Sequence, residues 1–327
     1  MDGLNLIAAL GGALLVASAV VVVLRHRSWL RRRHVIGLRW CGLLLELVLR
    51  MQQHRGMASA MLSGDASFRT ALRHKREEIE RLFSALQALP GDIDRSVANI
   101  AGHELPEIRK GWTALCAQLD GLTPFTSMTR HTALIGTLLF ALRNIGEICL
   151  SGRIARHDAR LDMVVPVFVD RLPALSEALG QIRALGSGVT AAGNASAEDR
   201  VRLSYLIHRI NELLGRSESA LEHAGLLKLA ETAGGFAHTR ERVGELLDMV
   251  CRDLLESREV KVSPQDYFAC ASTAIDSVFA LVAVLRQQLA FGLEVMPHTE
   301  TASAPMAAPA RRQGATSLHV PGAPSLS

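Results

Sequence analysis

Apolar residues recur at helical spacing along most of this chain, and short polar segments separate the apolar runs. Eight such runs are present, and none shows the strict alternation of apolar and polar positions that a half-buried strand requires. Prolines, glycines and polar caps set their limits. The pattern therefore predicts an all-α protein with helices over about 35–63, 65–89, 92–122, 124–151, 157–193, 196–222, 226–257 and 263–293.

Local signals place several of these boundaries. Ser196 with Asp199 is suited to cap one helix, and Ser263-Pro264 with Asp266 in the first turn is suited to open the last. Pro106 predicts an interruption in the third helix, because proline removes a backbone donor and disfavours helix at the preceding residue.

The two halves of the helical region show a faint internal similarity. Aligning Arg55 with Arg183 sets RGMASAML beside RALGSGVT, each followed by a polar turn and then a new helix. A duplication would give two antiparallel four-helix bundles, over about 35–151 and 158–293, joined near 152–157. Shared helical composition is the alternative explanation.

An uncharged apolar run lies near the N-terminus, from Leu6 to Leu24. Its length matches the roughly 20 residues needed to cross a bilayer, so it predicts a transmembrane helix. A cleaved signal peptide is disfavoured, because MDGLN has no Lys or Arg and the basic block RHRSWLRRRH, residues 25–34, follows the run. The positive-inside rule places the following residues in the cytoplasm; lipid binding is the other role open to the block.

These patterns define three parts of the chain. Residues 1–34 form a transmembrane anchor with a basic juxtamembrane segment, and residues 35–293 form the helical domain. The tail, residues 294–327, is rich in Pro, Ala, Ser and Gly. A segment of that composition buries little apolar surface, so we expect it to be disordered.

Composition narrows the functional classes. The chain is 49% hydrophobic but only 4% aromatic, which favours Leu- and Ala-rich helices. The net charge of +4 comes largely from the basic block, so we do not expect a nucleic-acid partner. The five cysteines are scattered, and neither a CxxC nor an HExxH spacing occurs. We find no catalytic or nucleotide-binding motif, and we expect no enzyme activity, metal or cofactor.

A positively charged residue occupies an apolar helix face within QQHRGMASAMLSGD. Steps of three and four place Arg55 on the same stripe as five apolar residues. A buried charge needs a partner, because an unpaired one is strongly unfavourable. The partner is either an anionic ligand or a glutamate of the protein, such as Glu46, Glu147 or Glu231. The apolar members of the stripe are Leu44, Val48, Met51, Ala58 and Leu62.

The same stretch carries a family resemblance. The segment QQHRGMASAML, followed by Gly64-Asp65 and Phe68, resembles the opening of the nitrate- and nitrite-sensing domain of bacterial signalling proteins. The resemblance covers about 35–293 and implies two four-helix bundles that bind nitrate or nitrite at their interface through arginines. Arg55 matches the opening motif directly. The second arginine is either Arg183, from the internal alignment, or Arg240, in HTRERV.

Together these observations suggest a single-pass sensor of the bacterial inner membrane with a cytoplasmic helical domain. A planar guanidinium can donate to two oxygens of a planar anion at once. No familiar output module follows the helices, so we expect the signal to reach another protein or a second copy of the chain. A membrane-tethered interaction or scaffold module without a small-molecule ligand is the alternative function.

Other candidates have simpler interpretations. Arg183 lies beside the best apolar stripe of its helix and is expected at an exposed or rim position. The run GSGVTAAG lacks the lysine of a phosphate-binding loop, so its small residues predict close helix contact instead. His238 and Thr239 have donors for an anion, but we interpret them as a satisfied polar pair. The stripe beside Arg183 contains Leu172, Leu175, Leu179, Ile182, Gly186 and Val189.

Overall fold

The computed structural model describes residues 2–151, 159–227, 235–257 and 259–292. Within these residues all regular secondary structure is helical, which confirms the all-α prediction. The tail at 294–327 and the junction at 152–157 lie outside the described residues. The helices are α1 Asp2–Leu62, α2 Phe68–Gln87, α3 Arg95–Asn99, α4 Leu105–Gln118, α5 Pro124–Leu150, α6 Ala159–Pro166, α7 Leu172–Ala192, α8 Ala197–His223, α9 Phe236–Met249 and α10 Pro264–Gly292.

Short π-helical segments connect or extend some of these helices. Ile100–Glu104 joins α3 to α4, Val167–Arg171 joins α6 to α7, and Val250–Glu256 extends α9. The first lies just before Pro106, where an interruption was expected. The chain remains helical there. Pro106 has no backbone N–H to donate, and a wider π-helical turn precedes it instead of a break.

Helix caps explain why several boundaries fall where the sequence places them. Ser196 and Asp199 form a reciprocal capping box at the start of α8, and Ser263 accepts from the backbone N–H of Asp266 at the start of α10. One predicted boundary is wrong. Leu226 does not begin a helix, because Gly225 adopts a φ of 67° in a turn after α8, and α9 begins at Phe236.

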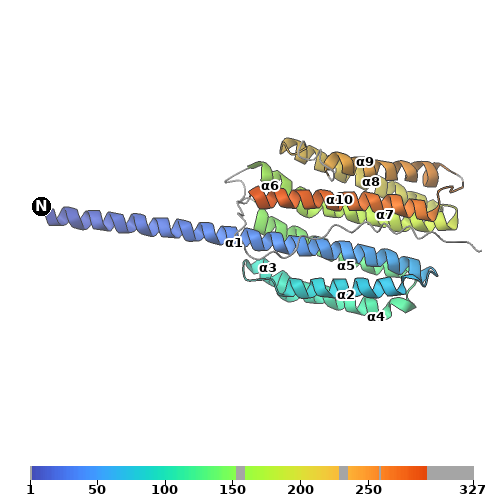
Figure 1. The fold of residues 1–327 in the computed structure, drawn as a ribbon, viewed down its shortest axis with the longest axis horizontal. Coiled ribbons are helices and arrows are strands. Elements are labelled where there is room, and N and C mark those ends of the chain that lie inside the picture. Colours follow the sequence, from blue (N-terminus) through green and yellow to red (C-terminus); the bar gives the residue numbers. More distant parts are fainter. Residues whose placement is uncertain (1, 152–158, 228–234, 258, 293–327) are drawn as a thin grey trace, which may run out of the picture. The chain divides into compact units, whose positions relative to one another are not determined.

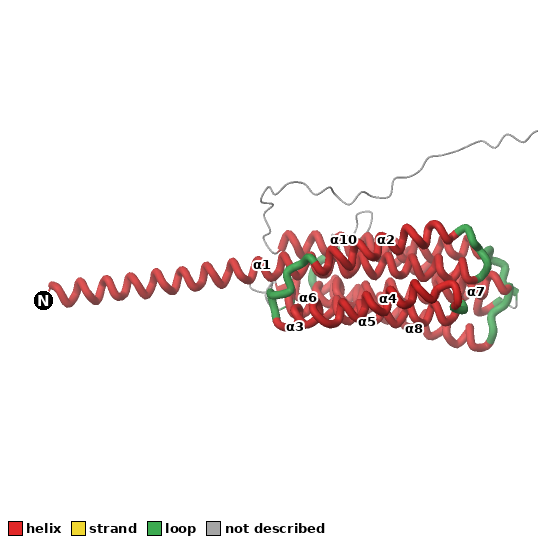
Figure 2. Tube along the Cα trace, turned by 90° about the horizontal axis from the view of Figure 1, so that it is seen from below, coloured by secondary structure: helices red, strands yellow, loops and turns green. Residues whose placement is uncertain are grey.

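The helices pack in two groups (Figures 1 and 2). In the first group, α1 packs against α2 and α5, and α4 packs against α5. In the second group, α7 packs against α8 and α10, and α10 packs against α9. Helix α1 also contacts α7 and α10, and α5 contacts α6 and α7, so these helices form the boundary between the groups. One continuous apolar core extends through both groups.

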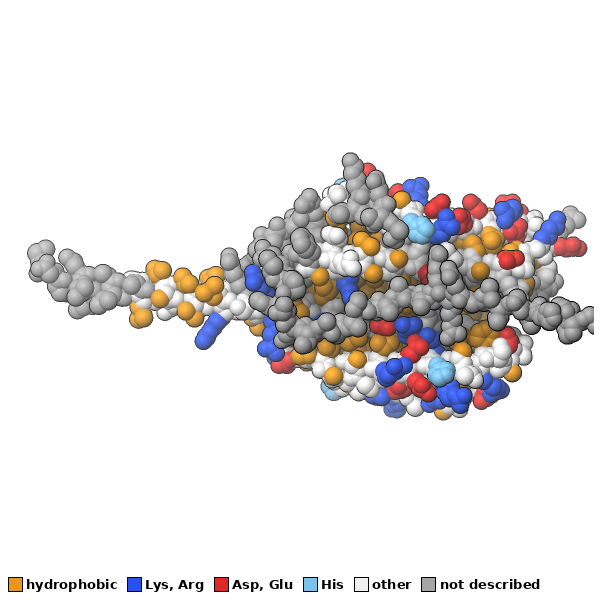
Figure 3. Space-filling model, viewed as in Figure 1, with side chains coloured by type: hydrophobic (Ala, Val, Ile, Leu, Met, Phe, Trp, Pro, Cys, Tyr) orange, Lys and Arg blue, Asp and Glu red, His pale blue; other side chains and the backbone are white. Residues whose placement is uncertain are grey.

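The N-terminal part of α1 extends away from the packed helices (Figure 1). Its apolar side chains from Leu14 to Leu24 are exposed, and Figure 3 shows them as an uncovered apolar surface on this helix. They belong to the predicted membrane span. Because α1 is one helix, it runs without a break from this apolar segment to Arg55.

Two other helices, α5 and α10, are also long and apolar enough to cross a membrane. Each has a face buried in the apolar core, including Ile135 and Leu138 on α5 and Ala274 and Val278 on α10. We therefore interpret both as core helices, since a core helix has the same length and composition as a membrane span.

Candidate anion site

Arg55 is buried on the apolar stripe of α1, as its helical spacing predicts. Only 1% of the residue is exposed, and Leu44, Val48 and Ala58 on the same stripe are completely buried. Its guanidinium forms a bidentate ion pair with Glu177, in which Nη1 lies 2.5 Å from Oε1 and Nη2 lies 3.2 Å from Oε2. Nη1 also donates to Thr132 Oγ1 at 2.8 Å. Arg55 of α1 therefore contacts both α5 and α7.

The acidic partner of Arg55 is not one of the three glutamates suggested by the sequence. Glu46 pairs with Arg50 and Glu147 with Arg143, while Glu231 lies outside the described residues. Those two described glutamates point to the helix surface, and their partners lie one helical turn away. Glu177 is 122 positions from Arg55 in the chain, and only the packing of α7 against α1 brings them together.

The Glu177 carboxylate accepts from two amide donors in addition to Arg55. Gln52 Nε2 donates to it at 3.0 Å, and Gln181 Nε2 donates at 2.9 Å. Glu177 is buried, and a buried carboxylate is tolerated only when it is paired and hydrogen-bonded. Gln52 and Arg55 lie on α1, whereas Glu177 and Gln181 lie on α7. This polar cluster therefore joins the two helix groups.

Two glycines make room for the arginines at this contact. A Cβ atom at Gly180 of α7 would lie 2.5 Å from Arg55 Nη2, and a Cβ atom at Gly56 of α1 would lie 3.4 Å from Arg183 Nη2. Each helix thus presents a glycine to the arginine of the other helix. The first distance is too short for any side chain to share the space, so Gly180 is required by the position of Arg55.

Arg183 is buried, not at the rim as the sequence suggested, with an exposed fraction of 8%. Nη1 donates to Ser272 Oγ at 3.2 Å, and the guanidinium lies 4.9 Å from the ring centre of Phe268. Among the described residues, no carboxylate forms an ion pair with it. Burial lowers the pKa of Arg183 to about 10, as does the nearby charge of Arg55. Arg183 remains protonated at neutral pH. The carboxylates of Asp276 and Glu177 raise its pKa by electrostatic attraction, but neither forms an ion pair with it.

The third candidate, Arg240, lies elsewhere. It is exposed on α9 and pairs with Glu218 of α8 at 2.7 Å. Nearby, His238 is also exposed, and the Thr239 hydroxyl donates to the carbonyl oxygens of Gly235 and Ser277. These residues do not line the cavity that contains Arg55 and Arg183.

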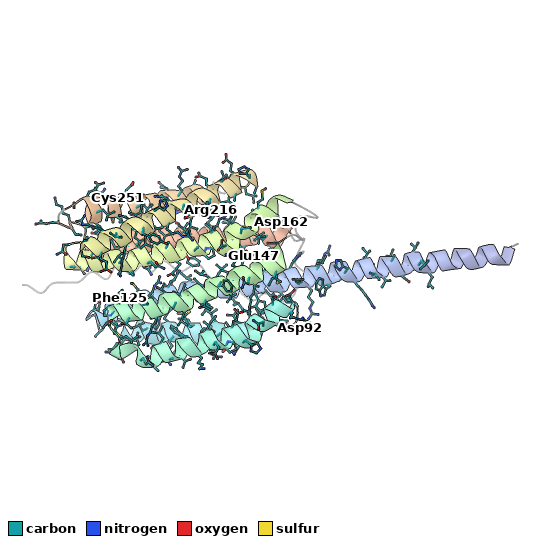
Figure 4. All side chains as sticks on the ribbon, turned by 180° about the vertical axis from the view of Figure 1, so that it is seen from behind. Asp92, Phe125, Glu147, Asp162, Arg216 and Cys251 are labelled. Carbon is teal, nitrogen blue, oxygen red and sulfur yellow. The ribbon has the colours of Figure 1, made fainter. Side chains whose placement is uncertain are left out.

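That cavity has a volume of about 670 Å³ and lies between α1 and α7, with contributions from α5, α8 and α10. Both helices line it mainly with small residues, so few side chains fill the space. Phe125, at the start of α5, marks its position at the end of the helices remote from the N-terminal extension (Figure 4). The small lining residues are Gly56, Ser59 and Ala60 of α1, Ser63 in the turn after it, and Gly180, Ala184, Ser187 and Gly188 of α7.

The small residues of GSGVTAAG serve two purposes. Gly186 permits close helix contact, as predicted, because a Cβ atom there would overlap the ring of Tyr267 on α10. The Tyr267 hydroxyl donates to the carbonyl oxygen of Ile182 at 2.6 Å and fixes this approach. Ser187 and Gly188 instead line the cavity.

A buried histidine pair adjoins the site, and no sequence motif indicated it. His131 Nδ1 lies 2.7 Å from the carbonyl oxygen of Ser127 and therefore carries the proton, so His131 Nε2 accepts from His54 Nδ1 at 2.9 Å. Trp112 packs edge-on against His54. Burial lowers the pKa of His54 to about 3, with a further effect of His131. Burial also lowers the pKa of His131 to about 4, with a smaller effect of Arg55.

No group of three or more His, Cys, Asp or Glu residues within the described ranges is arranged to hold a metal ion. The guanidinium groups at the cavity are suited to hydrogen bonding and charge pairing.

Comparison with known proteins identifies the helical domain. The family model described as nitrate and nitrite sensing, abbreviated NIT, matches residues 46–290. This chain belongs to the NIT family. The NIT domain therefore covers both helix groups and contains Arg55, Glu177 and Arg183, and the family is one of nitrate and nitrite sensing.

A solved structure supports the fold of the NIT domain. The transcription antiterminator NasR superimposes with a TM-score of 0.63 at 16% sequence identity, over 85% of this chain and 74% of that chain. At this identity the likeness concerns the fold alone. No curated protein matches this chain.

Proposed function

We propose that this chain is a membrane-anchored sensor that binds nitrate or nitrite in the cavity between α1 and α7. In this proposal residues 1–34 anchor the protein in a bacterial inner membrane. Residues 35–293 form the cytoplasmic sensing domain, in which the two helix groups act as antiparallel four-helix bundles. The chain binds no nucleic acid. The family membership supports the ligand class, and the exposed apolar segment of α1 supports the anchor.

The observation that carries this proposal is the buried charge of Arg183. A buried cation without a contacting carboxylate is unfavourable, and an anion in the cavity would relieve that cost. A planar monoanion suits a guanidinium, because two of its oxygens can accept from the fork at once. Charge-assisted hydrogen bonds contribute about 1.5–3 kcal/mol each, so a few of them are sufficient for micromolar affinity.

Arg55 supplies the second guanidinium of the cavity in this proposal. In the described structure its fork is occupied by Glu177, so an anion that reaches Arg55 competes with that carboxylate. Such competition would weaken the contact between α1 and α7 and change how the two bundles pack against each other. A ligand shifts a conformational equilibrium only through different affinities for the two states, and this competition supplies such a difference.

Helix α1 is the element through which the signal would leave the site. It contains Arg55 and continues to the apolar segment at its N-terminus without interruption. At the other end of the packed region, Arg33 pairs with Asp94 and donates to the carbonyl oxygen of Ile148, which holds α1 against the first helix group. We propose that a partner protein or a second copy of the chain receives this signal.

Calorimetric titration of the full chain in detergent tests the ligand. We expect binding of nitrate or nitrite and weaker binding of chloride and sulfate, which lack the matching planar shape. Arg183→Gln should abolish nitrate binding, whereas Arg240→Gln, at an exposed arginine outside the cavity, should leave it unchanged. Equal nitrate affinity of wild type and Arg183→Gln would refute the assignment of the site.

One observation favours a second function, that of a membrane-tethered interaction module without a small ligand. Arg55 is already satisfied by Glu177 and Thr132, as a purely structural ion pair would be. Failure of all four anions to bind the folded wild-type chain would support this alternative.

A further inference from the structure

The Arg183 cavity is much larger than the ligand proposed above. Nitrate has four heavy atoms and occupies on the order of two water volumes, taking about 30 Å³ per water. The cavity measures about 670 Å³, within the range of roughly 300–1,000 Å³ that holds drug-sized molecules. A nitrate ion in contact with Arg183 would leave most of this space to solvent.

The remaining walls are suited to an apolar body. Phe125 and Met128 of α5, Leu185 and Val189 of α7, and Phe268 of α10 line the same cavity. Phe125 is 57% exposed and Phe268 is 44% exposed, and the guanidinium of Arg202 lies 5.6 Å from the ring centre of Phe125. Phe268 also lies against the Arg183 guanidinium. An apolar wall therefore adjoins the charge of Arg183.

The distribution of charge around the cavity favours a ligand with one negative charge. Arg55 is paired with Glu177 in a buried contact, whereas Arg202 at the rim forms only an exposed pair with Glu198, of a kind that contributes about 0–1 kcal/mol. Asp65 and Asp199 also line the rim, and they would repel a second anionic group. Among the described lining residues, Arg183 is therefore the buried cation without an ion-pair partner.

The Arg55–Glu177 pair shows, at the same site, how a guanidinium binds a carboxylate. The Glu177 carboxylate is held by the two arms of the Arg55 guanidinium and by amide donors at the boundary of the same two helices. A carboxylate and a guanidinium are both planar and form two parallel hydrogen bonds. Arg183 can bind the carboxylate of a ligand in the same manner.

We propose that the Arg183 cavity binds an organic monocarboxylate with an apolar body, its carboxylate on Arg183 and its body between Phe125 and Phe268. The inference rests on the proposed function, because both use Arg183 to bind an anion, but the ligands that it names are larger than nitrate. It explains why the walls combine a buried cation that has no ion-pair partner with exposed aromatic rings.

The test uses the full chain in detergent and five probes: benzoate, acetate, nitrate, the dicarboxylate phthalate and the neutral analogue benzamide. We expect benzoate to bind at least tenfold more tightly than acetate, because its ring buries apolar surface in the cavity. Phthalate and benzamide should bind at least tenfold more weakly than benzoate. Benzamide also controls for partition of the ring into detergent. Affinity for benzoate no greater than for acetate would overturn the proposal.

Variants at exposed phenylalanines separate the aromatic wall from general effects. Phe125→Ala should weaken benzoate binding about tenfold and leave nitrate binding unchanged. Phe140→Ala changes an equally exposed phenylalanine of α5 outside the cavity and should alter neither. Both sites are exposed, so the variants should fold even if Arg183→Gln does not. Unchanged benzoate affinity in Phe125→Ala would overturn the proposal.

The outcomes distinguish this inference from the proposed function. Binding of nitrate without benzoate overturns the inference and leaves the sensor function intact. Binding of benzoate that requires Arg183, without nitrate binding, supports the inference and refutes nitrate sensing. Absence of binding by both overturns both.

Discussion

Replacement of Arg55 by leucine tests whether the Arg55–Glu177 pair holds the two helix groups together. The change restores an apolar stripe on α1 but leaves the Glu177 carboxylate buried with only the amide donors of Gln52 and Gln181. The Thr132 hydroxyl also loses a donor. Because the Glu177 side chain is only 9% exposed and its remaining hydrogen-bond partners in the described structure include no cation, we expect the variant to be destabilised.

The expected magnitude follows from the burial of both partners, whose side chains are 1% and 9% exposed. Removing one member of a buried pair costs about 3–5 kcal/mol. For a domain of this size, each kcal/mol lowers the melting temperature by about 2–4 °C, so the midpoint should fall by about 6–20 °C. Thermal unfolding of the full chain in detergent, followed by circular dichroism, measures this shift.

Arg50→Leu is the matched control. Arg50 lies on the same helix and pairs with Glu46 and Glu78, but these side chains are about one third exposed, with 30%, 31% and 32% exposure. A partly exposed pair contributes about 0–1 kcal/mol, so this variant should unfold close to wild type. The double variant Arg55→Leu with Glu177→Leu removes both charges and should recover much of the lost stability. Arg55→Leu with wild-type stability would refute the reasoning.

Three further predictions concern other parts of the molecule. The unfolding free energy should decrease as the pH falls from about 6.5 towards about 4, because the pKa values of His54 and His131 are lowered in the folded state and the unfolded chain binds protons first. His131→Phe should reduce this dependence on pH, measured by urea titrations between pH 7 and 4. An unchanged pH dependence would contradict the assignment. Gly180→Ala should destabilise the protein by about 1–3 kcal/mol, because its Cβ atom would meet Arg55 at 2.5 Å, whereas Gly56→Ala, with 3.4 Å to Arg183, should have a smaller effect in the same melts. A reporter fused to the C-terminus should be active in the cytoplasm, since the basic block follows the apolar span; periplasmic activity would exclude this topology.

Much of the helical architecture follows from local pattern. The stripe around Arg55 and the caps at Ser196 and Ser263 depend on residues within a few turns of one another, so their spacing in the sequence determines them. Apolar residues continue at helical spacing from Leu226, and no capping residue there contradicts a helix, so the start of α9 was predicted too early. In the structure Gly225 ends α8 in a turn, and α9 begins at Phe236. Local periodicity alone does not distinguish a helix from an apolar turn of a few residues.

The site was predicted in part. Arg55 was recognised because a charge on an apolar stripe is visible in one helix, and the internal alignment pointed to Arg183. That alignment did not indicate that Arg183 is buried, because its position beside the best stripe of α7 suggested a rim. The burial depends on Phe268 and Ser272 of α10, which cover the side chain and lie more than 80 positions away in the chain.

The sequence by itself determined that the chain is helical, where most helices begin and end, and that a guanidinium lies on a buried face of α1. These properties depend on interactions within one helix or its caps. Only the tertiary structure decided that Glu177 neutralises Arg55, that Arg183 is buried without an ion-pair partner, and that the small residues of α1 and α7 leave a cavity between them. Those properties depend on which faces of distant helices meet, because Coulomb and packing energies are set by distances in space and not by separation along the chain.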